Sequence, residues 1–337
     1  MINLLKYYAK KRIIIIGIIS IILILLSLIM FQGGFIYGTG EYVYIHNNPI
    51  NTIGALSIIL SIIVPIFEFS FKMRKVGVDE FYKFPIKRSK LFLVKYIVGL
   101  LEVVLPIVSF WLFMLIRILL SNHMFVLKYY FLFIIVLIVL IFFIYSIITF
   151  IYSKCNTIYD GLICIAFVSL LTFVGGEVID TMFNNLDVCL YSNFWLCPNT
   201  NDFFVFSPIT FISDIFRGLM DGYRYTRISE SQIISLTVNS LMGIASFVLL
   251  ITLSSKEKAE NSMDISSSWF SYKTLIPIYI VYLSTEIGTE VIFIILIAIM
   301  GYIGYAIYRR SFKIKVCDII TMSACIAAGL IIGNINL

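Results

Sequence analysis

Charged residues are scarce in this chain. They account for 13% of its 337 residues, whereas a soluble domain carries about 25%. Hydrophobic residues reach 61%, so little polar material remains to cover a water-facing surface. Continuous apolar runs of about 20 residues recur, which is the length that crosses a bilayer as a helix. The sequence therefore predicts an all-α polytopic membrane protein, because a β-barrel would show short alternating strands instead.

Histidine is almost absent, with His46 and His123 as its two positions. Both lie outside the apolar runs, which argues against a haem or catalytic zinc site within a helical bundle and against a Ser-His-Asp set. The sequence also contains no G-x-x-x-x-G-K-[ST] loop and no H-E-x-x-H motif. We therefore expect no catalytic residues, no directly bound nucleotide, cofactor or metal, and no enzymatic activity of its own.

The apolar runs and the basic residues together predict the topology. Most of the 25 Lys and Arg residues fall in alternate connections, namely 1–12, 71–95, 254–273 and 309–315, with Lys154 on the same side. Basic connections stay in the cytoplasm, so the N-terminus is predicted to be cytoplasmic. We expect eight or nine spans, at about 13–32, 51–70, 93–120, 129–152, 160–178, 233–253, 274–288, 290–308 and 316–334.

The ends of the chain and its longest outside segment have distinct patterns. Residues 1–12 place apolar and basic residues on opposite helical faces, which fits a short interfacial helix or a basic topology signal without fixed structure. The segment 179–232 is predicted to be extracellular. Residues 254–273 form a predicted cytoplasmic linker, and 274–337 a C-terminal membrane extension.

Three acids lie in or near predicted spans, and two cysteines lie outside. Glu68 and Glu177 are close enough to span ends to reach water, whereas Glu102 is the deepest. An ionisable group at that depth is a functional candidate, although pairing with a polar group of a neighbouring helix would also explain it. Cys189 and Cys197 flank "LYSNFWL" in the outside segment and could form a disulfide or remain free thiols.

The cytoplasmic stretch "GVDEFYKFPIKRSKLF", residues 77–92, is both charged and aromatic. Val78, Phe81 and Tyr82 share one face of a predicted short helix, and Pro85 ends it. Such a helix could dock a cytoplasmic partner, with the aromatics as anchors and Asp79 and Glu80 orienting them. An interfacial helix whose aromatic rings sit among lipid headgroups explains the pattern equally well.

This stretch resembles the first cytoplasmic loop of ABC-2 type transporter permeases. That loop carries an acidic, aromatic coupling helix followed by a Pro–Ile–Arg–Leu–Lys pattern, which Pro85, Ile86, Arg88, Leu91 and Lys95 match. Ser207–Pro208 before the sixth span also resembles the family. "SSKEKAENS" at 254–262 resembles a Firmicutes-type subgroup with extra C-terminal spans, although Lys stands where Arg is more usual.

The resemblance implies a six-span permease core at 13–253, with a coupling loop at 71–92. It implies a bacterial ABC exporter for a hydrophobic or amphipathic substrate, such as a peptide, lipid or drug. ATP and Mg²⁺ would bind to a separate cytoplasmic ABC ATPase subunit. A second permease chain, identical or a sister, would complete the complex in the cell membrane, and nucleic acid is not an expected partner.

Two other classes of protein remain open from the sequence. An ion- or proton-coupled secondary transporter would need no ATPase, but it predicts several ionisable groups in its spans and an internal repeat. Glu102 gives that class some support, and no clear repeat is visible between the halves. An intramembrane enzyme would need a nucleophile and base or a metal set, and the sequence offers neither.

Overall fold

The computed structural model describes residues 2–30, 48–82, 86–120, 127–169, 230–255, 272–286 and 291–335, and these are helical apart from short turns. One four-residue 3₁₀ turn, η2, spans Ser70–Met73. A further apolar helix spans Ile158–Ser169. The labelled helices are α1 (Ile2–Met30), α2 (Asn48–Phe69), α3 (Lys75–Tyr82), α4 (Arg88–Leu120), α5 (Leu127–Lys154), α8 (Glu230–Ser254), α9 (Tyr272–Glu286), α10 (Val291–Arg309) and α11 (Val316–Ile335).

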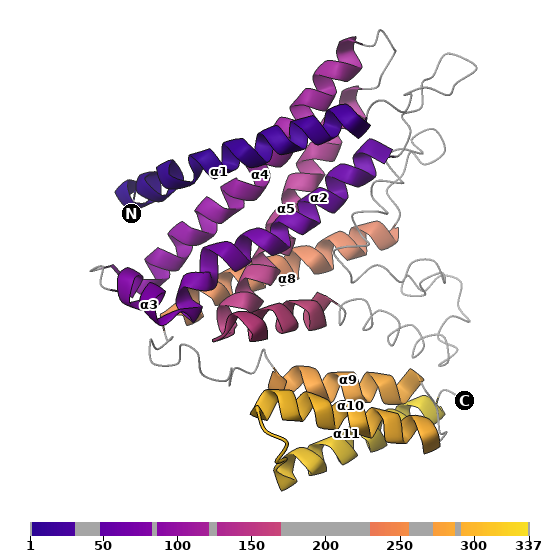
Figure 1. Cartoon of the computed structure of the whole chain (residues 1–337). Coiled ribbons are helices and arrows are strands. Elements are labelled where there is room, and N and C mark those ends of the chain that lie inside the picture. Colours follow the sequence, from indigo (N-terminus) through magenta and orange to yellow (C-terminus); the bar gives the residue numbers. More distant parts are fainter. Residues whose placement is uncertain are drawn as a thin grey trace, which may run out of the picture. The chain divides into compact units, whose positions relative to one another are not determined.

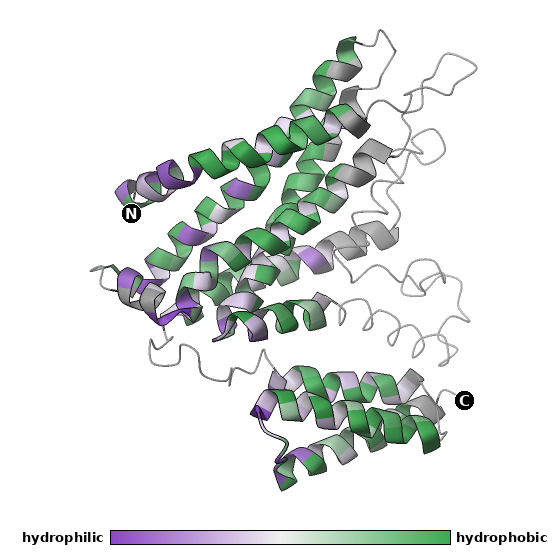
Figure 2. Ribbon diagram, viewed as in Figure 1, coloured by the Kyte–Doolittle hydropathy of each residue, from purple (hydrophilic) through white to green (hydrophobic). Residues whose placement is uncertain are grey.

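Five helical segments among the described residues are long and apolar enough to cross a membrane. Figure 2 shows that apolar residues predominate along the helices, with hydrophilic residues at the start of α1 and at α3. The prediction of a multi-pass helical membrane protein is therefore supported. Each predicted span coincides with a described helix, at least in part. The five segments are Asn3–Leu28, Ile53–Met73, Arg88–Ile116, Ile134–Lys154 and Val291–Arg309.

The first helix differs from both expectations for residues 1–12, a separate short interfacial helix and a basic topology signal without fixed structure. α1 runs unbroken from Ile2 to Met30, with no interruption at Arg12. Nothing in the sequence breaks it there, because the helix contains no proline and its one glycine is Gly17. The basic residues of the N-terminus therefore extend the first apolar helix rather than forming a separate element.

The chain divides into two compact units. The first comprises residues 1–71, 76–150 and 208–259, and the second comprises 72–75, 151–207 and 260–337. In the first unit α4 is the central helix, since α1, α2 and α8 all pack against it. Figure 1 shows α1 and α4 running side by side. This arrangement brings polar residues of α1, α2 and α4 to one place.

The second unit combines the helix Ile158–Ser169 with the three C-terminal helices. The Tyr272 hydroxyl on α9 donates a hydrogen bond to Asp160 over 3.0 Å, and the Tyr279 hydroxyl donates one to the carbonyl of Phe167. α9 packs against both α10 and α11. The fifth predicted span thus groups with the C-terminal helices, whereas the sequence places it within the six-span core.

A close approach of α9 and α11 depends on Gly329. A Cβ atom at this position would lie 2.6 Å from the carbonyl oxygen of Val281, a backbone atom that cannot swing away. We expect Gly329→Leu to lower the free energy of unfolding by about 2 kcal/mol through overpacking. Ala328→Leu is the matched control, because Ala328 is exposed on the same helix. Thermal melting of the full chain in detergent should separate the two variants; equal melting midpoints would contradict the packing.

Candidate functional site

Four charged side chains from three helices meet inside the first unit, and we call Arg12, Glu68, Lys95 and Glu102 the ion cluster. Arg12 of α1 forms ion pairs with Glu68 of α2 and with Glu102 of α4, the latter over 3.3 Å between Nε and Oε1. Lys95 of α4 donates a hydrogen bond to Oε2 of Glu68 over 2.9 Å. Glu68 therefore bridges two cations, and the four charges sum to zero.

The ion cluster is almost completely withdrawn from solvent. The side chains of Glu68, Glu102 and Lys95 are 1%, 4% and 5% exposed, and that of Arg12 is 24% exposed. Removing single charges from water costs several kcal/mol each, and only close pairing offsets that cost. The pairing therefore ties α1, α2 and α4 together at this point, because separating any one helix would leave a buried charge unmatched.

Three aromatic rings surround the ammonium group of Lys95, and we call Tyr8, Phe71 and Phe81 the aromatic cage. The Lys95 nitrogen lies 4.7 Å from the ring centre of Tyr8, 4.9 Å from that of Phe81 and 5.5 Å from that of Phe71. Ring faces attract a cation within about 6 Å. The cage stabilises the buried cation and also closes that end of the cluster to water.

Phe81 connects α3 to this cluster. Its ring centre lies 4.7 Å from that of Phe71 and 6.1 Å from that of Tyr8, so it packs against both other rings of the cage. Gly77 allows the start of α3 to lie close to the backbone of Phe71, since a Cβ atom at Gly77 would lie 2.5 Å from the Phe71 carbonyl oxygen. Among the described side chains of α3, that of Phe81 contacts the aromatic cage and Lys95.

Gly99 of α4 makes room for Glu68, the acid that bridges the two cations of the ion cluster. A Cβ atom at Gly99 would lie 3.2 Å from Cζ of Tyr145 and 3.3 Å from Cγ of Glu68. The absence of a side chain therefore lets the buried ring of Tyr145 and the stem of Glu68 approach α4 closely. Tyr145 is itself fully buried, so the cluster has packed walls as well as ionic partners.

The structure describes some of the predicted site residues and leaves others outside the described residues. A helix is confirmed over the docking segment, since α3 ends at Tyr82. Glu80 is exposed, whereas Phe81 is half-buried in the cage, which differs from the expectation of a free aromatic anchor. Arg88 begins α4. The side chains of Val78, Asp79 and Tyr82 lie outside the described residues, as do Pro85, Glu177, Cys189 and Cys197.

The structure shows the surroundings of two of the three acids predicted to lie in or near spans, Glu68 and Glu102. Glu102 pairs with Arg12 of a neighbouring helix, which is one of the two explanations that the sequence left open. The expectation that Glu68 reaches water is wrong, because packing of the cage and of Tyr145 leaves it 1% exposed. The sequence groups Lys95 with the bases of the connection 71–95, but α4 begins seven residues earlier at Arg88 and buries it.

Sequence reasoning did not identify Arg12, Lys95, Tyr8 or Phe71 as parts of one site. Two spacings were available as signals. Tyr8 and Arg12 are four residues apart, and Lys95 and Glu102 are seven apart, so each pair shares one face of its helix. A basic and an acidic residue two turns apart on an apolar helix indicate a polar stripe that needs partners from other helices.

The four charges of the ion cluster form one shared ionic network between α1, α2 and α4. Arg12 is shared between two carboxylates, and Glu68 is shared between two cations, so small displacements of α1 or α4 change which pairs are closest. Comparison of the chain with family models, with curated proteins and with solved structures finds no match.

Proposed function

We propose that this chain is the membrane subunit of a bacterial ABC exporter, and that α3 is the element on which a separate cytoplasmic ATPase acts. The observation that carries the proposal is the contact between α3 and the ion cluster. α3 is a short helix of eight residues between two long apolar helices, and its Phe81 packs onto the cage of Lys95. A push on α3 therefore has a direct route to α1, α2 and α4.

The expected cycle uses that route. ATP binding closes the ATPase, which displaces α3, and Phe81 then shifts the cage and Lys95. Because Lys95 shares Glu68 with Arg12, its displacement changes the balance between the Arg12–Glu68 and Arg12–Glu102 pairs. The helices respond as rigid bodies, and two permease chains alternate between inward-open and outward-open states. The substrate class remains that of the resemblance, a hydrophobic or amphipathic peptide, lipid or drug.

Proton-coupled secondary transport is the second candidate, and one observation favours it. Glu68 and Glu102 are both buried and share Arg12, which places two carboxylates close together within apolar helices. Buried carboxylates of this kind form proton pathways in transporters. However, two cations balance their charge, and proton coupling gives no role to α3.

The two candidates differ in whether α3, whose Glu80 is exposed, binds a protein. If an ATPase docks there, Glu80→Lys should weaken its co-purification with the chain in mild detergent. We expect about a fivefold loss of affinity at low salt that shrinks as salt rises, since an exposed charge at an interface rim is screened. Glu80→Gln is the graded control and should lose less. Absence of any ATPase from the wild-type complex would favour the secondary transporter.

A further inference from the structure

The turn between α10 and α11, residues 310–315, concentrates positive charge beside an exposed aromatic ring. Arg310, Lys313 and Lys315 are all exposed, and Arg309 ends the preceding helix. Phe312 is 83% exposed, the highest value for any large hydrophobic side chain among the described residues. A phenyl ring at the tip of a basic turn is costly in water but suits the boundary between lipid and water.

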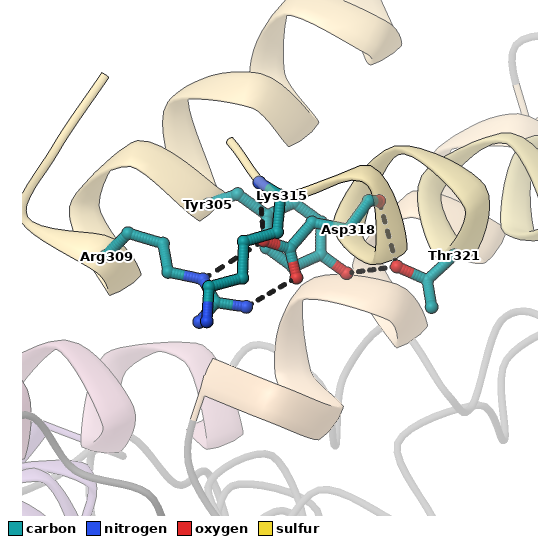
Figure 3. Close-up of polar contacts among 5 residues, drawn as sticks. All are labelled: Tyr305, Arg309, Lys315, Asp318 and Thr321. Carbon is teal, nitrogen blue, oxygen red and sulfur yellow. Dashed lines mark hydrogen bonds and ion pairs between the residues drawn. The ribbon is translucent and has the colours of Figure 1, made fainter. Parts of the chain in front are cut away.

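Asp318, the acid that follows this turn in the sequence, already has partners within the second unit. Asp318 is buried and receives two hydrogen bonds from Arg309, over 3.0 Å from Nε and 2.8 Å from the terminal nitrogen, as Figure 3 shows. It also accepts the backbone N–H of Lys315 over 3.4 Å, which caps the start of α11. Asp318 thus neutralises Arg309, whereas the amines of Lys313 and Lys315 have no ion-pair partner among the described residues.

Arg310 occupies a backbone conformation that normally selects glycine. Its φ angle is 49°, in the left-handed region. The amide of Arg310 donates a hydrogen bond to the carbonyl of Ile307, and that of Ser311 donates one to the carbonyl of Ala306. This is the Schellman motif, in which glycine usually occupies the left-handed position after the helix. A non-glycine residue there is strained, and strain of this kind points to a role for the side chain. The contact of Arg310 with Asp160 is long, 3.8 Å, and its side chain is 51% exposed, so that pair is weak.

The neighbouring helices place this turn at a membrane boundary. α10 is long and apolar enough to span, and large apolar side chains are exposed along it up to its last turn. α11 continues the pattern, with Val316, Ile319 and Ile320 exposed directly after the turn. Lipid chains would cover these surfaces, so the bases between them would lie at the depth of the headgroups. The exposed residues of α10 include Ile292, Leu296, Ile299, Ile303 and Ile307.

We propose that the α10–α11 turn is a binding site for an anionic phospholipid. Lys313, Lys315 and Arg310 contact the phosphate and the anionic headgroup, and Phe312 packs at the base of the acyl chains. Each base near an anionic membrane surface strengthens binding about fivefold. The Arg309–Asp318 pair holds the turn in shape, because it fixes the end of α10 to the start of α11. This inference does not depend on the proposed transport function.

The test measures lipid binding to the full chain in neutral detergent by native mass spectrometry, with phosphatidylglycerol and phosphatidylcholine as probes. Lys313→Gln with Lys315→Gln should weaken the tightest phosphatidylglycerol binding about 30-fold and leave phosphatidylcholine unchanged. Lys6→Gln with Lys10→Gln removes the same charge from exposed sites on α1 and should change it less than threefold. Arg310→Gly should weaken phosphatidylglycerol binding about fivefold without lowering the melting midpoint, because glycine fits the left-handed position.

Three results would contradict the proposed lipid site. Unchanged phosphatidylglycerol affinity in the Lys313 and Lys315 variant would overturn the proposal. An equal loss in the α1 control would also overturn it, since the preference would then follow net charge alone. No preference for phosphatidylglycerol over phosphatidylcholine in the wild-type chain would indicate that the turn meets another occupant, such as an acidic protein surface. The melting midpoint of each variant shows whether the helices remain packed.

Discussion

Replacing Glu68 with alanine should destabilise this protein by about 3–5 kcal/mol, the usual result of removing one partner from a buried ion pair. The effect is large because Glu68 is 1% exposed and contacts both Arg12 and Lys95. Arg12 keeps Glu102 after the change, but Lys95 loses its hydrogen-bonded carboxylate. We expect a clearly lower melting midpoint for the purified chain in detergent. Glu80→Ala is the matched control, because this exposed acid should change stability by less than about 0.5 kcal/mol.

A double variant separates the charge effect from a simple loss of packing. Glu68→Leu combined with Lys95→Met removes one anion and one cation and leaves Arg12 paired with Glu102. Hydrophobic replacements of a buried ion pair are often neutral or stabilising, so this variant should recover most of the stability that Glu68→Ala loses. If the double variant melts no higher than the single one, uncompensated charge is not the cause. A Glu68→Ala protein that melts like the wild type would contradict the ion cluster itself.

The sequence predicted the long elements well because membrane helices obey a simple length rule. The apolar run 51–70 corresponds to α2 (Asn48–Phe69), and the run 316–334 to α11 (Val316–Ile335). Proline at positions 65, 106 and 277 lies within helices without ending them, which membrane helices tolerate. The end of α3 at Tyr82 was also predictable, since Pro85 follows closely.

The candidate site was less predictable because its residues belong to different helices. Glu102 stands out in the sequence as a deep acid, but its partner Arg12 lies ninety residues earlier, in a segment that the sequence predicts to be an interfacial helix or a basic topology signal. Lys95 belongs both to the basic connection 71–95 and to the start of the predicted span 93–120, and only the helix beginning at Arg88 shows that it lies inside α4. The left-handed conformation of Arg310 had no signal at all, because glycine is the residue that usually reveals such a position.

Truncating Phe81 should uncouple the proposed transporter while leaving the ATPase bound. The ring of Phe81 is engaged with Phe71, Tyr8 and Lys95 of its own chain, so it is not the free anchor that the sequence suggested. Its removal in Phe81→Ala breaks the described contact between α3 and the ion cluster. A loss of about 2 kcal/mol in coupling free energy corresponds to about a thirtyfold loss of substrate-stimulated ATP hydrolysis.

The measurement compares ATPase co-purification with transport-coupled hydrolysis in reconstituted membranes. Phe81→Leu is the matched control, because it keeps an apolar side chain against Phe71 and should retain most of the coupling. Loss of ATPase binding in Phe81→Ala would mean that the ring is a docking anchor after all, and the proposed transmission through Lys95 would fail. Unchanged binding and unchanged coupling would remove α3 from the mechanism. The buried carboxylates Glu68 and Glu102 would then be the stronger argument, and proton-coupled transport the better proposal.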